Sequence, residues 1–129
     1  MKNITIIIPL GKNKEAEGIE TIKNQKLRLI TEIGLNPSKN RNCGIKKART
    51  EFVAFINGHT YLSKDWAKKV IKFFAKYPEI DIVGGPQLNY EKDGFFAKAS
   101  SHALGSIFGA ANVSQIYAGK KTRLDADET

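Results

Sequence analysis

Asn57, Gly58 and His59 are the residues of this sequence whose types and spacing best suit chemistry, and they directly follow the apolar run Phe52 to Ile56. Asn-Gly between two apolar and β-branched runs is a strong hairpin signal, because both residues tolerate the positive φ of a type I′ turn. In the alternative interpretation, Asn57 and His59 project from the carboxyl end of a buried parallel strand, which is where α/β proteins bind ligands. The strands and helices predicted on either side of the tripeptide show whether a turn or a binding site is the better interpretation.

The chain before residue 34 predicts a β-α-β unit. The run Ile4 to Leu10 is almost continuously β-branched, which predicts a central parallel strand covered on both faces. Glu15 to Lys26 can form a short helix that turns Ile19 and Ile22 inward. Leu27 to Ile33 alternates apolar with polar residues, so it predicts a second strand that is half exposed or near an edge.

A turn cluster at residues 36–40 leads into the next predicted helix, Arg41 to Arg49. The residues expected to face the core from this helix are Cys43 or Gly44, Ile45 and Ala48. Phe52 to Ile56 is apolar at every position, which predicts a third strand in a central place in the sheet.

A third helix is predicted directly after the tripeptide. Ser63 is its expected N-cap, and Asp65 in the first turn would complement the helix dipole. Pro78 ends the pattern. The apolar residues that recur at helical spacing are Trp66, Val70, Phe73 or Phe74, and Tyr77, with lysines mainly on the other faces.

Two further elements complete the predicted order. Asp81 to Gly85 predicts a short fourth strand, and Phe95 to Phe108 a last helix. Strands that alternate with helices indicate an α/β fold with a mostly parallel sheet flanked by helices. Because the third helix begins so soon after His59, little chain remains for a hairpin's return strand. The element order therefore favours the strand-end interpretation of Asn57 and His59.

Length and composition indicate an ordinary globular protein. The chain has 129 residues, which suits one domain, and it is 41% apolar and 26% charged. Its single cysteine, Cys43, excludes an internal disulfide and suits a reducing cytoplasm. A structural zinc site made of cysteines is excluded as well, since such a site needs four ligands.

The net charge of +8 comes mostly from lysines that are spread along the chain. Such a surface attracts polyanions, namely nucleic acid, acidic lipid head groups or the diphosphate of a nucleotide, although a merely solvated lysine-rich surface explains it equally well. No apolar run approaches the ~20 residues needed to span a bilayer. The run Ile4 to Leu10 is too short for a signal peptide and has no small-residue cleavage site behind it.

Several segments, taken in order, resemble the family 2 glycosyltransferases, enzymes of the GT-A fold that transfer a sugar from a nucleotide donor. These segments are ITIIIPL, TIKNQ and the long stretch RNCGIKKARTEFVAFINGHTYLSKDWAKKVIKFFAKYPEIDIVGGP. The segments SSHALGSIFGAANVSQIYAGKK and LDADET are similar to the succinoglycan-type branch, whose metal motif is Asp-Gly-His. The resemblance covers nearly the whole chain and implies a single GT-A-like nucleotide-sugar-binding domain over residues 1–129.

The resemblance implies a site for a nucleotide-sugar donor and a divalent metal. Mn²⁺ or Mg²⁺ would be held by Asn57 and His59, because these ions take oxygen ligands and Mn²⁺ accepts imidazole. A saccharide or a lipid-linked acceptor would be glycosylated in the cytoplasm, at the inner face of a membrane. The residues expected to bind the donor are Pro9, Glu32, Arg41, Asn57 and Gly58, and Gly84 and Gly85 are expected on the acceptor side.

The sequence also departs from the family pattern. Asn57 stands where the branch has aspartate, and a neutral ligand attracts a dication much less. The segment after Glu32 runs almost directly into the next helix, and LDADET ends before the region where the family usually supplies its catalytic base. No catalytic residue is therefore assigned. Two alternatives stay open, an inactive interaction domain and a basic nucleic-acid-binding module, although the placement of the aromatic residues disfavours nucleic acid. The sequence also leaves open whether the protein forms an oligomer.

Overall fold

The computed structural model describes residues 4–85, 94–96, 98 and 99. The chain divides after Glu79 into two units, and each is described by itself. The described part of the first unit contains β1 (Ile4–Leu10), α1 (Ile19–Asn24), β2 (Arg28–Ile33), α2 (Pro37–Lys47), β3 (Phe52–Phe55) and α3 (Trp66–Lys76).

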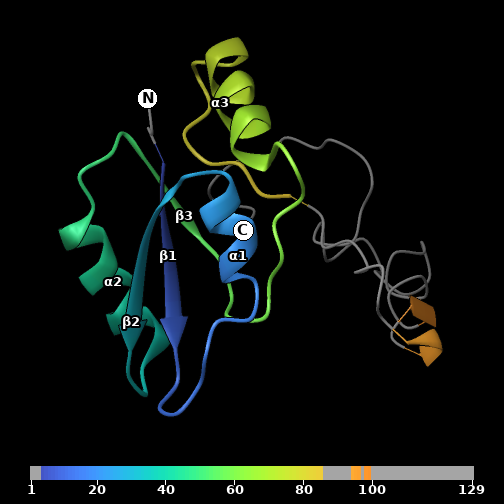
Figure 1. Ribbon diagram of the computed structural model, residues 1–129. Helices are drawn as coiled ribbons and strands as arrows, with labels where there is room; N and C mark the ends of the chain where they lie inside the picture. Colours follow the sequence, from blue (N-terminus) through green and yellow to red (C-terminus); the bar gives the residue numbers. More distant parts are fainter. Residues whose placement is uncertain (1–3, 86–93, 97, 100–129) are drawn as a thin grey trace, which may run out of the picture. The chain divides into compact units, whose positions relative to one another are not determined.

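The three strands form a parallel sheet in the order β2-β1-β3, with helices on both faces (Figure 1). Thr5 lies opposite Arg28 on one side and opposite Val53 on the other. Because β1 has a strand on each side and a helical layer over each face, its residues are almost completely buried. The predicted α/β class and the central position of the first strand are confirmed.

One face of the sheet is covered by α1 and α3. The side chain of Ile22 is fully buried there, which stabilises the fold by roughly 1.5–3 kcal/mol relative to an exposed isoleucine. Phe74 of α3 stacks on Phe52 of β3, with ring centroids 4.7 Å apart. The buried members of this core are Ile4, Ile6, Ile8, Leu10, Ile22, Ile56, Leu62 and Ala67. Helix α1 is shorter than predicted, but Ile22 points inward as expected.

The opposite face is covered by α2, which begins four residues earlier than predicted. Asn36 is its N-cap and accepts a hydrogen bond from the Lys39 N–H at 3.0 Å, and Pro37 occupies the first helical position. Gly44 lies against Ile7, and a Cβ there would come within 2.5 Å of Ile7 Cγ2. Glycine therefore lets α2 approach β1 closely. Of the two alternatives for the inward residue, Gly44 is buried and Cys43 is exposed.

Three predictions about this unit are wrong. β3 lies at an edge of the described sheet and not in its centre. The side chains of Val53 and Phe55 are 40% and 46% exposed, because α2 packs over β1 and β2. Ile45 is 44% exposed, since Gly44 is the residue of α2 that meets the sheet. The N-cap of α3 is Asp65, in a left-handed conformation with φ 62°, so Ser63 precedes the cap. The end of α3 at Lys76, just before Pro78, agrees with the sequence.

The second unit is described only in part. Residues 81–85 form no strand, so the predicted fourth strand is wrong; Gly84 and Gly85 weaken a strand, and Ile82 is 88% exposed. Residues 95, 96, 98 and 99 are helical, and the rest of the predicted last helix lies outside the described residues. None of the helices in the described part of the chain has the length and apolar character needed to cross a bilayer.

Candidate functional site

The carboxyl ends of the three parallel strands meet at one edge of the sheet. The Gly34 N–H, just after β2, donates to the Leu10 carbonyl at the end of β1 at 2.9 Å. The Ile56 N–H, just after β3, donates to the Ile7 carbonyl at 3.1 Å. The chain thus leaves β3 beside the end of β1, so that Asn57, Gly58 and His59 emerge at this edge.

The tripeptide forms a turn, but not a hairpin. The Thr60 N–H donates to the Asn57 carbonyl at 3.0 Å, which makes Gly58 and His59 the central residues. Asn57 has a negative φ, as do all the described glycines, so a type I′ turn centred on Asn57 and Gly58 is wrong. β3 runs parallel to its neighbour and continues into α3. The strand-end interpretation describes the backbone correctly.

Gly58 ties the turn to the end of β1. A Cβ at this position would lie 2.8 Å from Leu10 Cδ2, and the Gly58 carbonyl accepts a 2.7 Å hydrogen bond from the Glu17 N–H. This hydrogen bond therefore holds the loop between β1 and α1 against the turn after β3. The absence of a side chain at Gly58 serves this packing.

Asn57 and His59 both have exposed side chains at the carboxyl edge. Their amide and imidazole groups are ligands that Mn²⁺ accepts, but neither brings a negative charge. Among the described residues, no group of three histidine, cysteine, aspartate or glutamate side chains is placed to hold a metal ion. The two residues therefore fit the expected metal only in part, and a complete ligand set would need oxygen atoms from the donor and from water.

Glu32 is placed against α2. Its carboxylate lies 2.6 Å from Lys47 Nζ, and its side chain is only 12% exposed. The hydrogen bond from Lys47 holds the pKa of this carboxyl below its ordinary value of 4.5, against the opposing effect of burial, and the Cys43 thiol lowers it further. Glu32 pairs in register with Pro9, the other predicted donor residue on the strands. Its charge is thus already balanced within the fold.

The remaining predicted residues fall in two places. Arg41 lies in α2, where it is half buried. Gly84 and Gly85 belong to the second unit, where nothing lies within 4 Å of a Cβ built on either of them.

Asn40 stabilises the carboxyl edge of the sheet, and the sequence patterns did not single it out. Its Nδ2 donates to the Leu10 carbonyl at 3.4 Å and to the Gly34 carbonyl at 3.2 Å. The side chain thereby joins the start of α2 to the ends of β1 and β2. Its position four residues before the buried Gly44 was an available signal, since it places a polar side chain on the inward face of the helix.

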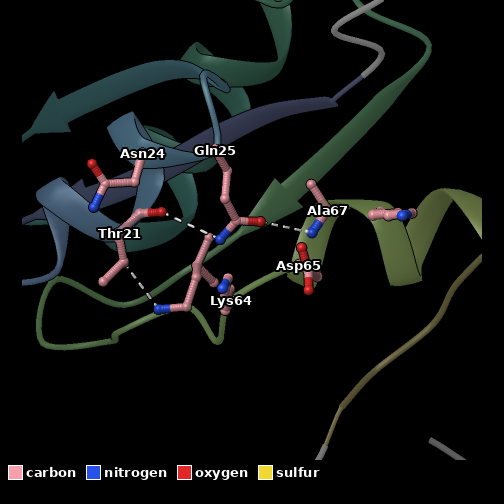
Figure 2. A pocket seen from close by; sticks show the side chains of 8 residues that line it. Thr21, Asn24, Gln25, Lys64, Asp65 and Ala67 are labelled. Carbon is pink, nitrogen blue, oxygen red and sulfur yellow. Dashed lines mark hydrogen bonds between the residues drawn. The ribbon is translucent and has the colours of Figure 1, made fainter.

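Gln25 and Thr21 lie in the quoted segment TIKNQ, but the sequence assigned neither of them a role in the site. Gln25 Nε2 donates to the Thr21 carbonyl at 3.2 Å, and its Oε1 accepts the Ala67 N–H at 3.0 Å (Figure 2). Gln25 Nε2 also donates to the Ser63 carbonyl at 3.1 Å. Thr21 Oγ1 accepts the Leu62 N–H at 3.0 Å and donates to the Gly18 carbonyl at 2.6 Å. Helix α1 and its C-cap residue Gln25 therefore hold the segment that connects the tripeptide to α3, and Gln25 caps the first turn of α3.

An open hollow of about 560 Å³ lies between the end of α1 and the start of α3 (Figure 2). Its lining residues are Thr21, Asn24, Gln25, Leu62, Lys64, Asp65, Ala67 and Lys68. The tripeptide does not line it. Because Thr21 and Gln25 already use their polar atoms on the backbone, we regard the hollow as the junction of the two helices and place the candidate site at the carboxyl edge.

The sequence model of glycosyl transferase family 2 matches residues 12–127 of the chain. No curated protein and no solved structure matches it. The family match covers the loop after β1, the whole of β2 and β3, and the turn that carries Asn57 and His59. The parallel sheet with its helical layers is consistent with a GT-A-like domain. The chain belongs to glycosyl transferase family 2.

Proposed function

We propose that the chain binds a nucleotide-sugar donor at the carboxyl edge of its sheet and transfers the sugar to an acceptor hydroxyl. The observation that carries this proposal is the position of Asn57 and His59, exposed on a turn beside the end of β1 in a chain of this family. Ligands of open α/β sheets bind at the carboxyl ends of the strands. The succinoglycan-type branch is the part of the family in which we place the chain.

The proposed reaction is a displacement at the anomeric carbon of the donor. The acceptor oxygen forms a bond to that carbon from the face opposite the nucleotide, and the bond to the diphosphate oxygen breaks, so the configuration is inverted. The hydroxyl proton passes to a base, a role for which we name no residue. The diphosphate gains negative charge as it leaves, and the guanidinium of Arg41 is our candidate for holding its oxygens.

Mn²⁺ or Mg²⁺ is the cofactor that we propose for donor binding. When bound, such an ion supplies positive charge against the diphosphate. Asn57 and His59 would contribute an amide oxygen and an imidazole nitrogen, while phosphate oxygens and water complete the ligands. Asn57 also favours a second candidate function, a domain that binds the donor without turnover, because the neutral amide weakens the attraction for the ion.

Thermal unfolding tests the binding proposal. The protein is melted with UDP, GDP and dTDP, each with and without millimolar Mn²⁺. Ligand at ~100 times its dissociation constant adds about 2.7 kcal/mol to the free energy of unfolding, which raises the Tm of a protein of this size by several degrees. We expect a metal-dependent rise with one nucleotide. If the protein unfolds cooperatively and none of the nucleotides changes its Tm, the proposal of donor binding is wrong.

A further inference from the structure

The two faces of α3 differ completely in chemistry. Its inward face packs Val70 and Ile71 against the core of the first unit. Its outward face carries four exposed lysines, Lys68, Lys69, Lys72 and Lys76. At about 100° and ~1.5 Å per residue, these lysines fall within an arc of roughly 100° along ~12 Å of the helix. The outward face of α3 is thus a compact stripe of positive charge, here called the lysine stripe.

No carboxylate in the described part of the chain forms an ion pair with the lysines of this stripe. The sequence has no aspartate or glutamate from residue 66 to residue 78, and Asp65 and Glu79 flank this segment. Lys68, Lys69 and Lys72 have no carboxylate partner among the described residues. Lys76 Nζ lies 5.2 Å from the centre of the Tyr77 ring. This contrasts with α2, where Lys47 is paired with Glu32.

The excess charge of the chain is concentrated in the first unit. Residues 1–79 hold 16 of the 21 lysines and arginines, but only seven of the 13 aspartates and glutamates. The lysine stripe therefore lies within a positive field that the rest of the unit reinforces.

We propose that the lysine stripe of α3 docks the protein on an anionic lipid surface. The apolar face of α3 is used in the protein core, so the contact is electrostatic and lies at the level of the head groups. Lysine ammonium groups act as point charges and suit a diffuse anionic surface, whereas nucleic-acid recognition favours arginine and stacked aromatic side chains. None of the four stripe positions is an arginine or an aromatic residue, and the ring of Phe74 in α3 packs inward on Phe52. This docking is independent of the proposed donor binding.

Vesicle sedimentation tests the proposal on the full chain. The parent protein is mixed with vesicles of phosphatidylcholine alone and of phosphatidylcholine with phosphatidylglycerol, at 50 mM and 300 mM salt. The stripe variant is Lys68→Gln, Lys69→Gln and Lys72→Gln combined. The matched control is Lys39→Gln, Lys46→Gln and Arg49→Gln combined, which removes the same charge from exposed residues in and just after α2, on the other face of the sheet. Unchanged thermal unfolding verifies that both variants are folded.

The parent is expected to bind only the vesicles that contain phosphatidylglycerol, and more weakly at the higher salt concentration. Each lysine at such a surface is worth about five-fold in binding, so the stripe variant should bind roughly 100-fold more weakly, and the control much less so. If both variants lose vesicle binding equally, the lysine stripe is not the docking surface, and only the overall charge of the protein causes binding. Failure of the parent to bind would overturn membrane docking. So would tighter binding of a 20-nucleotide RNA that competes with the vesicles and depends on the same three lysines.

Discussion

Glu32 is a largely enclosed strand carboxylate whose charge is balanced by Lys47 of α2. The family resemblance suggested a place for it beside the donor, which stays a prediction; in the structure its side chain lies beside Lys47 of α2. A strand residue changes face with every step along the chain, so its register decides which neighbours it meets. Its neighbours on α2 were not visible in the sequence, because they depend on where that helix begins.

The ion pair predicts a pH dependence of stability. Lys47 lowers the pKa of Glu32 in the folded state, so the unfolded chain binds more protons in acid. The pair's contribution to stability is complete above the ordinary pKa of 4.5 and is lost as the pH falls through the lowered folded pKa. Lys47→Gln should therefore destabilise the protein at pH 6, and by less and less as the pH falls below 4.5.

Urea unfolding of the parent and the variant across this pH range measures the effect. Lys46→Gln is the control, since Lys46 is an exposed neighbour on α2 without a carboxylate partner among the described residues. If the parent and Lys47→Gln lose stability in parallel from pH 6 to pH 2.5, the ion pair does not contribute as described.

At the scale of the elements, the segment between β3 and α3 is held in place by α1. Gln25 caps α3 through the Ala67 N–H and binds the Ser63 carbonyl, while Thr21 binds the Leu62 N–H. These bonds fix the segment that carries the tripeptide into the helix. The contact joins residues about 40 positions apart in the chain, which is why local patterns did not predict it.

Gln25→Ala should lower the free energy of unfolding by about 1–3 kcal/mol, because it removes a helix cap and leaves backbone groups of two elements without their partner. Lys23→Ala, at an exposed position of α1, should change the free energy of unfolding by less than about 0.5 kcal/mol. Chemical denaturation of both variants gives the comparison. Equal values for the two would show that the Gln25 bonds do not hold α1 to α3.

At the scale of the whole molecule, the sequence predicted the elements whose patterns are long and regular. The β-branched run of β1 and the helical spacing in α3 correctly predicted a buried strand and an amphipathic helix. Patterns could not predict that β3 lies at an edge, since this depends on the order of the strands and on which of them α2 covers. The tripeptide was located correctly at the end of β3, but its turn depends on a hydrogen bond between Asn57 and Thr60.

The central claim is that the donor binds at the carboxyl edge beside Asn57. The measurement that tests it most directly is the affinity for the stabilising nucleotide, with millimolar Mn²⁺, of the parent, Asn57→Asp and Asn24→Asp. Asn24 lines the hollow between α1 and α3, so its variant adds the same charge at the rival location. A carboxylate near the metal gains about 1 kcal/mol or more of Coulomb attraction, so Asn57→Asp should bind at least about five-fold more tightly while Asn24→Asp should not. Unchanged affinity in Asn57→Asp, or an equal gain in Asn24→Asp, would contradict the assignment of the site.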